Sequence, residues 1–284
     1  MSLGLCLSGG GVKGAAHIGA IKALEEENIK PDFISGTSSG SIVATLYAVG
    51  YSAEEIKKIF TENATKIKYF DLKNIKNIII NLIKKKKFSI EGLNTGEIIE
   101  KIINKYCNKK GIKNINEIKE NLLIASVSIN TGNVYFFQSK YNNVRYSDEF
   151  IYINNINIGK AVRASCSYPG IFCPYQMNND LLIDGGVREN IPWKQVKNMG
   201  IDKVLCITFE EKEKEKKDKN IIDIISRSLN LIGRELNNYE LIGADYLLKI
   251  NTKNVSLLDY SKINYLYNEG YYQMKKYLNK IKIK

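Results

Sequence analysis

Two short apolar segments near the start of the chain each lead through a glycine-containing turn into a helical pattern. Leu3 to Ser8 precedes a helix predicted over Ala15 to Asn28, and Phe33 to Ser35 precedes a helix predicted over Ser41 to Val49. Strand, turn and helix in repeated order are typical of a parallel sheet covered by helices. This order predicts an α/β protein.

Weaker signals predict the remaining elements. Further strands are predicted at Leu122 to Ile129, Val134 to Gln138, Leu181 to Ile183 and Val204 to Phe209. The first two flank a predicted hairpin turn at 130–133. Ser52 and Glu55 have the spacing of a capping box and predict a helix start. The mixed-charge run 210–219 is predicted to be a solvated loop or a helix start, and helical segments with Tyr and Leu are predicted to close the chain.

Length and composition predict one globular domain. The 284 residues are 44% hydrophobic and 25% charged, which suits a chain with one large core. No internal repeat and no Pro/Gly/Ser-rich linker divides the sequence, so we predict a single domain over 1–284. A Lys- and Asn-rich stretch from about 65 to 120 is predicted to be a helical insertion or lid within it.

Several classes of protein are disfavoured. The strongly apolar runs, such as Ile78 to Ile80, are far shorter than the roughly 20 residues of a transmembrane helix. The N-terminus does not resemble a secretory signal. Five cysteines without a C-x-x-C pair, together with a single histidine, argue against a zinc site. We therefore predict no metal, no cofactor and a cytoplasmic location with reduced thiols.

The net charge of +12 raises the question of an anionic partner. Only five of the 42 basic residues are Arg, the residue on which proteins that read bases mostly depend, so nucleic acid is not predicted as a partner. A Lys excess suits attraction to an anionic membrane surface. A general bias of the chain toward Lys, Asn and Ile explains the charge equally well.

A serine lies in the second glycine-containing turn. The sequence Gly36-Thr37-Ser38-Ser39-Gly40 lies between a predicted strand and a predicted helix, which is the setting of a nucleophile elbow. The two flanking glycines allow a tight turn that presents Ser38 at the positive end of the following helix. The alternative is a Ser-rich turn that only caps the helix.

A nucleophilic serine needs a base, and the single histidine limits the choice. His17 precedes Ser38, so the Ser, acid, His order of an α/β-hydrolase triad is absent. The base must then be a carboxylate or a lysine, or His17 used in an unusual way, although we expect His17 to be a packing or hydrogen-bonding residue. Asp184, followed by Gly185 and Gly186, ends a predicted strand, where α/β active sites gather. Asp184 is therefore the candidate base, although an Asp that opens a turn fits the pattern as well.

The first glycine turn suits an anion. Gly9-Gly10-Gly11-Val12-Lys13-Gly14 supplies backbone N–H groups at a helix start, which could hold a phosphate or the oxyanion of an acyl-transfer intermediate. The G-x-G-x-x-G spacing also occurs in dinucleotide sites, but the acid expected at the end of the second strand is replaced there by Ser38. A nucleotide-binding protein using this loop is the alternative from a different class.

Four blocks of the sequence, in order, resemble the bacterial patatin-like phospholipase family. They are Leu7 to Gly19, Gly36 to Ser41, Arg163 to Phe172 with its Ala-Ser-x-x-x-Pro segment, and Asp184 to Pro192. The resemblance covers most of the chain. It implies a three-layer α/β/α fold with a mostly parallel central sheet, to which the sequence adds a Lys-rich helical insertion.

The resemblance also implies a site and an activity. Ser38 would be the nucleophile and Asp184 the general base of a Ser-Asp dyad, with the N–H groups of Gly9, Gly10 and Gly11 forming the oxyanion hole. The supporting motif positions are Lys13, Gly14, Gly36, Gly40, Gly185, Gly186 and Pro169. The implied reaction is metal-free hydrolysis of fatty-acyl esters of phospholipids or lysophospholipids through an acyl-serine. A lipid acyltransferase that uses the same dyad is the close alternative.

One segment is a candidate for membrane contact. Ile75 to Phe88 places an Ile/Leu cluster next to Lys84 to Lys87, the pairing that an interfacial helix needs. We predict that this segment belongs to a lid or docking surface, which would make the cytoplasmic protein peripheral at an anionic membrane. Ordinary core isoleucines and solvated lysines are the alternative.

Overall fold

A nine-stranded sheet forms the centre of the molecule in the computed structural model, which describes residues 1–67, 92–140, 147–210, 221–253 and 255–281. Seven strands follow one another in the order β5-β4-β3-β2-β1-β8-β9, and β7 joins β3 while β6 joins β7. The strands are β1 (Leu3–Leu7), β2 (Phe33–Thr37), β3 (Asn121–Ser128), β4 (Val134–Gln138), β5 (Phe150–Ile153), β6 (Tyr175–Met177), β7 (Asp180–Asp184), β8 (Lys203–Glu210) and β9 (Tyr246–Asn251).

Most strand pairs are parallel, as predicted. The pairs β1–β2, β1–β8, β2–β3, β4–β5 and β8–β9 are parallel, whereas β3–β4, β3–β7 and β6–β7 are antiparallel. The predicted hairpin connects β3 to β4. The connections from β1 to β2, from β2 to β3 and from β8 to β9 run through helices, as crossovers between parallel strands usually do.

The register on β3 brings two distant parts of the sequence together. Thr37, the last residue of β2, is paired with Ala125 of β3. Asp184, the last residue of β7, is paired with Ser126, the next residue of β3. Because β7 continues along β3 where β2 ends, the residue after β2 and the last residue of β7 meet at one point of the sheet.

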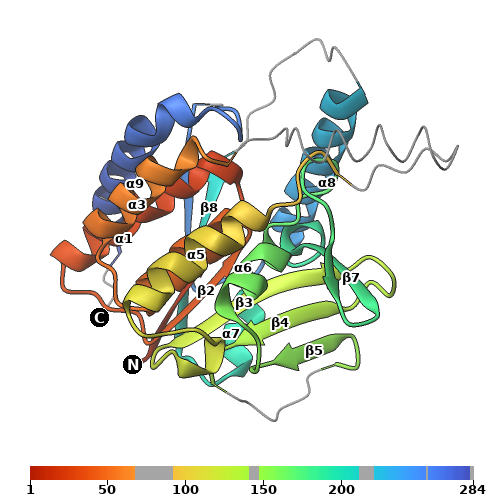
Figure 1. Ribbon diagram of the computed structural model, residues 1–284. Coiled ribbons are helices and arrows are strands. Elements are labelled where there is room, and N and C mark those ends of the chain that lie inside the picture. The colour runs from red at the N-terminus through yellow and green to blue at the C-terminus, as the bar shows by residue number, and fades with distance from the viewer. Residues whose placement is uncertain (68–91, 141–146, 211–220, 254, 282–284) are drawn as a thin grey trace, which may run out of the picture.

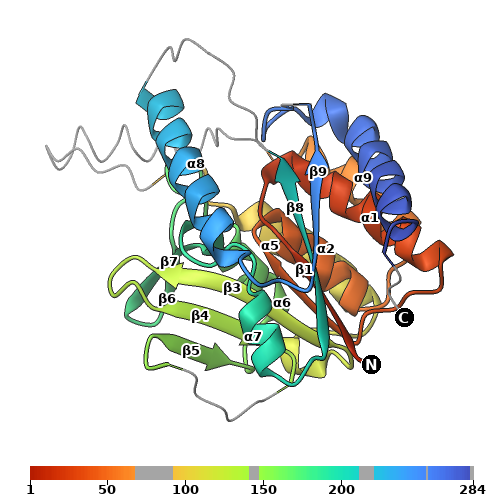
Figure 2. The same ribbon diagram turned by 180° about the vertical axis from the view of Figure 1, so that it is seen from behind.

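Helices cover both faces of the sheet (Figures 1 and 2). They are α1 (Gly14–Glu26), α2 (Ser39–Ala48), α3 (Ala53–Ala64), α5 (Glu97–Lys109), α6 (Ile158–Ser165), α7 (Trp193–Asn198), α8 (Ile221–Glu240) and α9 (Ile263–Leu278), with short 3-10 turns η1 (Gly11–Lys13), η2 (Ile115–Glu117), η3 (Gly185–Val187) and η4 (Tyr260–Lys262). Figure 2 shows α7 on the face opposite to α2 and α5, while α8 projects from one side of the molecule.

The two faces of β1 show how the layers are built. Leu5 and Leu7 are buried in the larger core, which contains residues of α1, α2, α3, α5 and α9. Cys6, between them, is buried in the smaller core with Trp193 and Val196 of α7. This alternation follows from the two-residue period of a strand. The result is the predicted three-layer α/β/α arrangement.

The structure confirms some predicted element boundaries and corrects others. Ser52 caps α3 through a capping box in which Glu55 N donates to Ser52 Oγ at 3.3 Å. The predicted helical segments near the end of the chain are α8 and α9, but the strand β9, which was not predicted, lies between them and pairs with β8. Of the predicted insertion at 65–120, the described part contains α5, whose Ile99 and Ile103 are buried in the larger core. Ile75 to Phe88 lies outside the described residues, as does most of the charged run 210–219.

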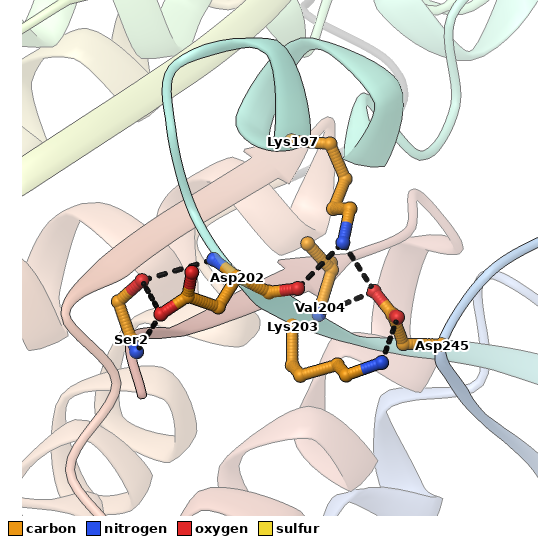
Figure 3. Close-up of polar contacts among 6 residues, drawn as sticks. All are labelled: Ser2, Lys197, Asp202, Lys203, Val204 and Asp245. Atoms are coloured by element: carbon orange, nitrogen blue, oxygen red, sulfur yellow. Dashed lines mark hydrogen bonds and ion pairs between the residues drawn. The ribbon is translucent and has the colours of Figure 1, made fainter.

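A polar network fixes the end of the sheet where β1 and β8 begin (Figure 3). Asp245 accepts hydrogen bonds from Lys203 Nζ at 2.9 Å, Lys197 Nζ at 3.0 Å and Val204 N at 3.1 Å. Asp202 Oδ2 accepts one from Ser2 N at 2.7 Å. These bonds tie the start of β1 to the segments that enter β8 and β9, and they leave the opposite end of the strands for the site described next.

Candidate active site

Ser38 occupies a strained position between β2 and α2. Its φ of 52° and ψ of −125° lie outside the regions that a residue with a side chain favours. Ser38 is at the N-cap position of α2, yet its side chain makes no capping hydrogen bond. The interpretation of Ser38 as a simple helix cap is therefore not supported. Backbone strain of this kind persists where surrounding contacts impose it, and it is concentrated at functional sites.

Close backbone contacts on both sides require the two flanking glycines. A Cβ on Gly36 would lie 2.4 Å from the carbonyl oxygen of Gly40. A Cβ on Gly40 would lie 2.4 Å from the carbonyl oxygen of Leu7 at the end of β1. Neither position has room for a side chain, so Gly36 and Gly40 allow the sharp turn at Ser38.

The backbone of Ser38 is held on both sides. Its N–H donates to Ser165 Oγ at 2.9 Å, and its carbonyl oxygen accepts from Ser41 Oγ at 2.6 Å. Ser165 is the last residue of α6 and belongs to the Ala-Ser-x-x-x-Pro block. These contacts fix the strained turn while the Ser38 side chain remains at the surface of a cavity.

Asp184 lies beside Ser38, as the register on β3 requires. Its carboxyl group is buried, and Oδ1 accepts a hydrogen bond from Gly186 N at 2.8 Å. Oδ2 is buried and has no hydrogen bond of normal geometry among the described residues. Burial raises the pKa of Asp184 to about 6, against a smaller lowering by the nearby Ser38 hydroxyl and by the Gly186 N–H. A carboxylate with a raised pKa is a stronger base than an exposed one.

The first glycine turn lies against Ser38, but its N–H groups are not equivalent. A Cβ on Gly9 would lie 3.0 Å from the Cβ of Ser38. Gly9 N donates to Asn190 Oδ1 at 2.8 Å, so in this structure it already has an acceptor. The N–H groups of Gly10 and Gly11 donate to no other residue in the described part of the chain, and both residues line the cavity. Gly10 and Gly11 are therefore the candidate donors.

Residues at the end of the first glycine turn and in α1 pack against this turn. His17 is fully buried, bonds through Nε2 to the carbonyl oxygen of Ser8 at 2.9 Å, and lies against the Phe209 ring with the two planes tilted by 36°. Burial lowers the pKa of His17 to about 4. Lys13 is buried over the same Phe209 ring, and a Cβ on Gly14 would lie 3.0 Å from the Cβ of Ser39. His17 thus packs and hydrogen-bonds, as expected, and it does not line the cavity.

The remaining motif positions shape the loops around the dyad. A Cβ on Gly185 would lie 2.5 Å from the carbonyl oxygen of Ala125, and one on Gly186 would lie 3.1 Å from Asp184 Oδ1. Pro169 is half-buried and is not among the residues that line the cavity. Within its block the buried Arg163 holds the chain instead, because it donates to the carbonyl oxygens of Thr95 and Cys173.

An apolar cavity of about 320 Å³ opens at Ser38 and Asp184. One wall comes from α2, α3 and α5, with side chains such as Ile42, Leu46, Ile59, Ala64, Ile99 and Ile103. The opposite side is lined by α8 and by Leu257, Leu258 and Tyr260. The size suits a small-molecule ligand, and the lining suits a hydrocarbon chain.

The chain belongs to the patatin-like phospholipase family, because the family model "Patatin-like phospholipase" matches residues 5–197. An uncharacterized protein of Acanthamoeba polyphaga mimivirus is 34% identical over 215 residues, which span 72% of this chain and 64% of that protein. Lysophospholipase NTE1 of Saccharomyces cerevisiae is 26% identical over 207 residues, which span 72% of this chain but 11% of the yeast protein. The chain thus spans less than two thirds of either relative.

A solved structure shares the fold. The crystal structure of VipD from Legionella pneumophila has a TM-score of 0.59 and 18% sequence identity, and it covers 98% of this chain and 67% of that chain. Because relatives occur in a virus and a yeast, the comparisons establish the family of this chain but not the bacterial origin that the resemblance implied. None of the helices in the described ranges has both the length and the apolar character that crossing a bilayer requires.

Three features of the site were missing from the sequence-based prediction. Asn190, which binds Gly9, and Ser165, which binds Ser38, were within quoted motifs but had no assigned role. The side of the cavity formed by α8 was not predicted at all. The position of Asn190 six residues after Asp184, within the same motif, was a signal from which a role for Asn190 could have been predicted. No local feature of the sequence marks α8 as part of the site.

Proposed function

We propose that this protein is a serine acyl hydrolase that cleaves fatty-acyl esters of phospholipids or lysophospholipids. The observation that carries the proposal is the strained, uncapped Ser38 beside buried Asp184 at the mouth of an apolar cavity. Family membership supports lipid ester hydrolysis at the level of the family. The yeast relative that is named a lysophospholipase supports the substrate class.

The proposed reaction uses two residues and the glycine turn. Ser38 Oγ attacks the ester carbonyl carbon while Asp184 accepts its proton, and the N–H groups of Gly10 and Gly11 bind the oxyanion. Asp184 then gives the proton to the departing glycerol oxygen, which leaves an acyl-serine. Water attacks this ester, Asp184 accepts the proton of the water, and the Ser38 oxygen takes it back as the fatty acid leaves.

The burial of Asp184 suits this cycle. In the free protein Asp184 Oδ2 has no hydrogen bond of normal geometry among the described residues, and we expect one from the Ser38 hydroxyl to form when the substrate excludes water from the site. The position of Ser38 at the start of α2 adds the positive end of a helix dipole near the developing negative charge. The wall formed by α2, α3 and α5 is apolar and is the proposed site of the acyl chain.

The test of the proposed function is the identity of the products. Purified protein is incubated with mixed vesicles of phospholipid and lysophospholipid, and the products are identified by mass spectrometry. We expect free fatty acid and the matching deacylated lipid, with neither formed by a Ser38→Ala variant. Transfer of the acyl group to an added alcohol, without free fatty acid, would instead show an acyltransferase.

The raised pKa of Asp184 predicts the pH dependence of kcat/KM. The base must be ionised in the free enzyme, so kcat/KM should fall about tenfold for each pH unit below pH 6. An exposed aspartate with a pKa of about 3.9 would place this limb two units lower. The measurement uses a short soluble ester, so that lipid packing does not change with pH. A limb near pH 4 would contradict the assignment of buried Asp184 as the base.

Two other buried carboxyl groups have raised pKa values, and one of them provides the control for this profile. Burial raises the pKa of Glu189 to about 8 and that of Glu240 to about 7. A Glu240→Gln variant should keep the limb near pH 6. The residual activity of an Asp184→Asn variant should lack that limb.

A further inference from the structure

The most concentrated apolar surface of the described residues lies on α8 and the turn that follows it. Six of the ten large hydrophobic side chains that are exposed belong to this α8 face: Ile224, Leu231, Ile232, Leu236, Tyr239 and Ile242. Ile224, Tyr239 and Ile242 are 53%, 70% and 68% exposed. Scattered exposed hydrophobic residues are ordinary, but a continuous apolar face on one helix indicates a binding surface.

The spacing puts the centre of this set on one side of the helix. Relative to Ile224, the positions of Leu231 and Tyr239 are i+7 and i+15, which fall within an arc of about 80° at 100° per residue, and Ile242 lies in the turn that follows α8. Glu235 lies in the same arc and pairs with Arg234 at 3.6 Å. An apolar stripe that includes a charge suits shallow contact with an interface rather than deep burial.

The α8 face is continuous with the rim of the active-site cavity. Ile232 belongs both to this face and to the cavity lining, where it is joined by Gly233 and Asn237 of α8. Across the opening, Leu258 is exposed and also lines the cavity. A lipid that leaves a bilayer at α8 would therefore reach the cavity beside Ile232 and Leu258, with Arg234 and Asn237 as its polar neighbours on α8.

The anchored end of α8 connects this surface to the catalytic loops. Asn237 Oδ1 accepts from Asn190 Nδ2 at 2.9 Å, and the carbonyl oxygen of Glu240 accepts from Trp193 Nε1 at 2.6 Å. Asn190 in turn binds Gly9. From this end α8 extends away from the body of the molecule, and both views place it on the side opposite to α9 (Figures 1 and 2).

We propose that the α8 face is the surface by which the protein docks on a bilayer that contains anionic phospholipid. The proposal rests on the proposed function, because a lipid hydrolase must reach its substrate at such an interface. The bilayer is favoured over a protein partner by the continuity of the face with the apolar cavity and by the net charge of +12. The charge attracts the protein from a distance, and the apolar side chains then enter the interface.

A matched pair of fluorescent reporters tests the location of the contact. Tyr239 on α8 and Tyr272 on α9 are 70% and 67% exposed, so each is replaced by Trp in a Ser38→Ala background that cannot consume the lipid. The native Trp193 is buried and provides the baseline. With vesicles of phosphatidylglycerol and brominated phosphatidylcholine, the Tyr239→Trp variant should show a blue shift and strong quenching. Equal or absent quenching of the two reporters would overturn the proposal.

Removal of the apolar side chains tests whether the face drives binding. In an Ile224→Gln/Tyr239→Gln/Ile242→Gln variant, partition to anionic vesicles should fall at least about tenfold, with a similar loss of fatty acid release from vesicles. Hydrolysis of a short soluble ester should stay unchanged, since none of the three residues lines the cavity. The control Tyr272→Gln should bind vesicles like the wild type.

The outcomes separate docking from catalysis. Undiminished partition of the triple variant would contradict the docking surface even if the enzyme is active. A wild-type dimer in sedimentation that the triple variant converts to monomer would show that a second copy occupies the face, and this too would contradict the proposal. Vesicle binding through α8 without hydrolysis of any ester would leave docking intact and refute the proposed function.

Discussion

Ser38→Ala should abolish ester hydrolysis, with a loss in kcat of at least about 10⁴-fold, because the acyl-serine cannot form. The alanine takes the same strained backbone position as the serine, so the fold should persist. The measurement is kcat on a short soluble ester, together with mass analysis after reaction with a fluorophosphonate. The probe should label Ser38 in the wild type and nothing in the variant.

A buried serine in the strand that precedes Ser38 is the matched control. Ser35 in β2 is fully buried, and its hydroxyl has no hydrogen-bond partner among the described residues. Ser35→Ala should therefore keep activity and labelling near the wild-type level. Labelling of a different serine, or hydrolysis that survives Ser38→Ala, would remove Ser38 from the mechanism.

Asp184→Asn should lower kcat by about 10² to 10⁴, since it removes the general base and keeps the shape of the side chain. The amide oxygen can still accept the hydrogen bond from Gly186 N, so the loop should retain its conformation. Steady-state kinetics on the soluble ester give the loss. A thermal melt close to that of the wild type shows that the loss does not come from unfolding.

Two variants show whether the loss is specific to Asp184. Asp180, at the other end of β7, accepts hydrogen bonds from Ser128 and Tyr135, so Asp180→Asn should keep kcat while lowering stability. His17→Gln should retain most of the activity, because His17 is buried away from the cavity. A severe effect of His17→Gln combined with a mild effect of Asp184→Asn would mean that the dyad is wrong.

Local patterns were enough to predict β1, β2 and the helices that follow these two strands. The strand, glycine turn and helix order around Gly9 and Gly36 is encoded within about 20 residues each, and so is the capping box at Ser52. The strand β9 was missed because Tyr246–Asn251 mixes Tyr, Leu and Lys in a pattern that suits helix or strand equally. The segment forms a strand because it pairs with β8, and the local sequence does not reveal this contact.

The site was predictable in its chemistry but not in its surroundings. The residue types at Ser38, Asp184 and the glycine turn limit the available reactions, and the lack of a suitably placed histidine narrows them further. The capture of the Gly9 N–H by Asn190 depends on a contact across 181 residues, and so no local pattern could show it. The cavity walls arise from packing between α2, α3, α5 and α8, which periodicity does not specify.

The register on β3 has a consequence for how such a protein can change. The positions of Ser38 and Asp184 are set by adjacent pairings with Ala125 and Ser126, not by the length of chain between the two residues. Segments inserted into the crossover before β3, or into the loops between β4 and β7, leave these pairings in place and add only slowly growing loop entropy. The chemistry and the substrate pocket can therefore diversify independently: an ancestor could gain or lose whole walls of the cavity while its reacting atoms stayed aligned.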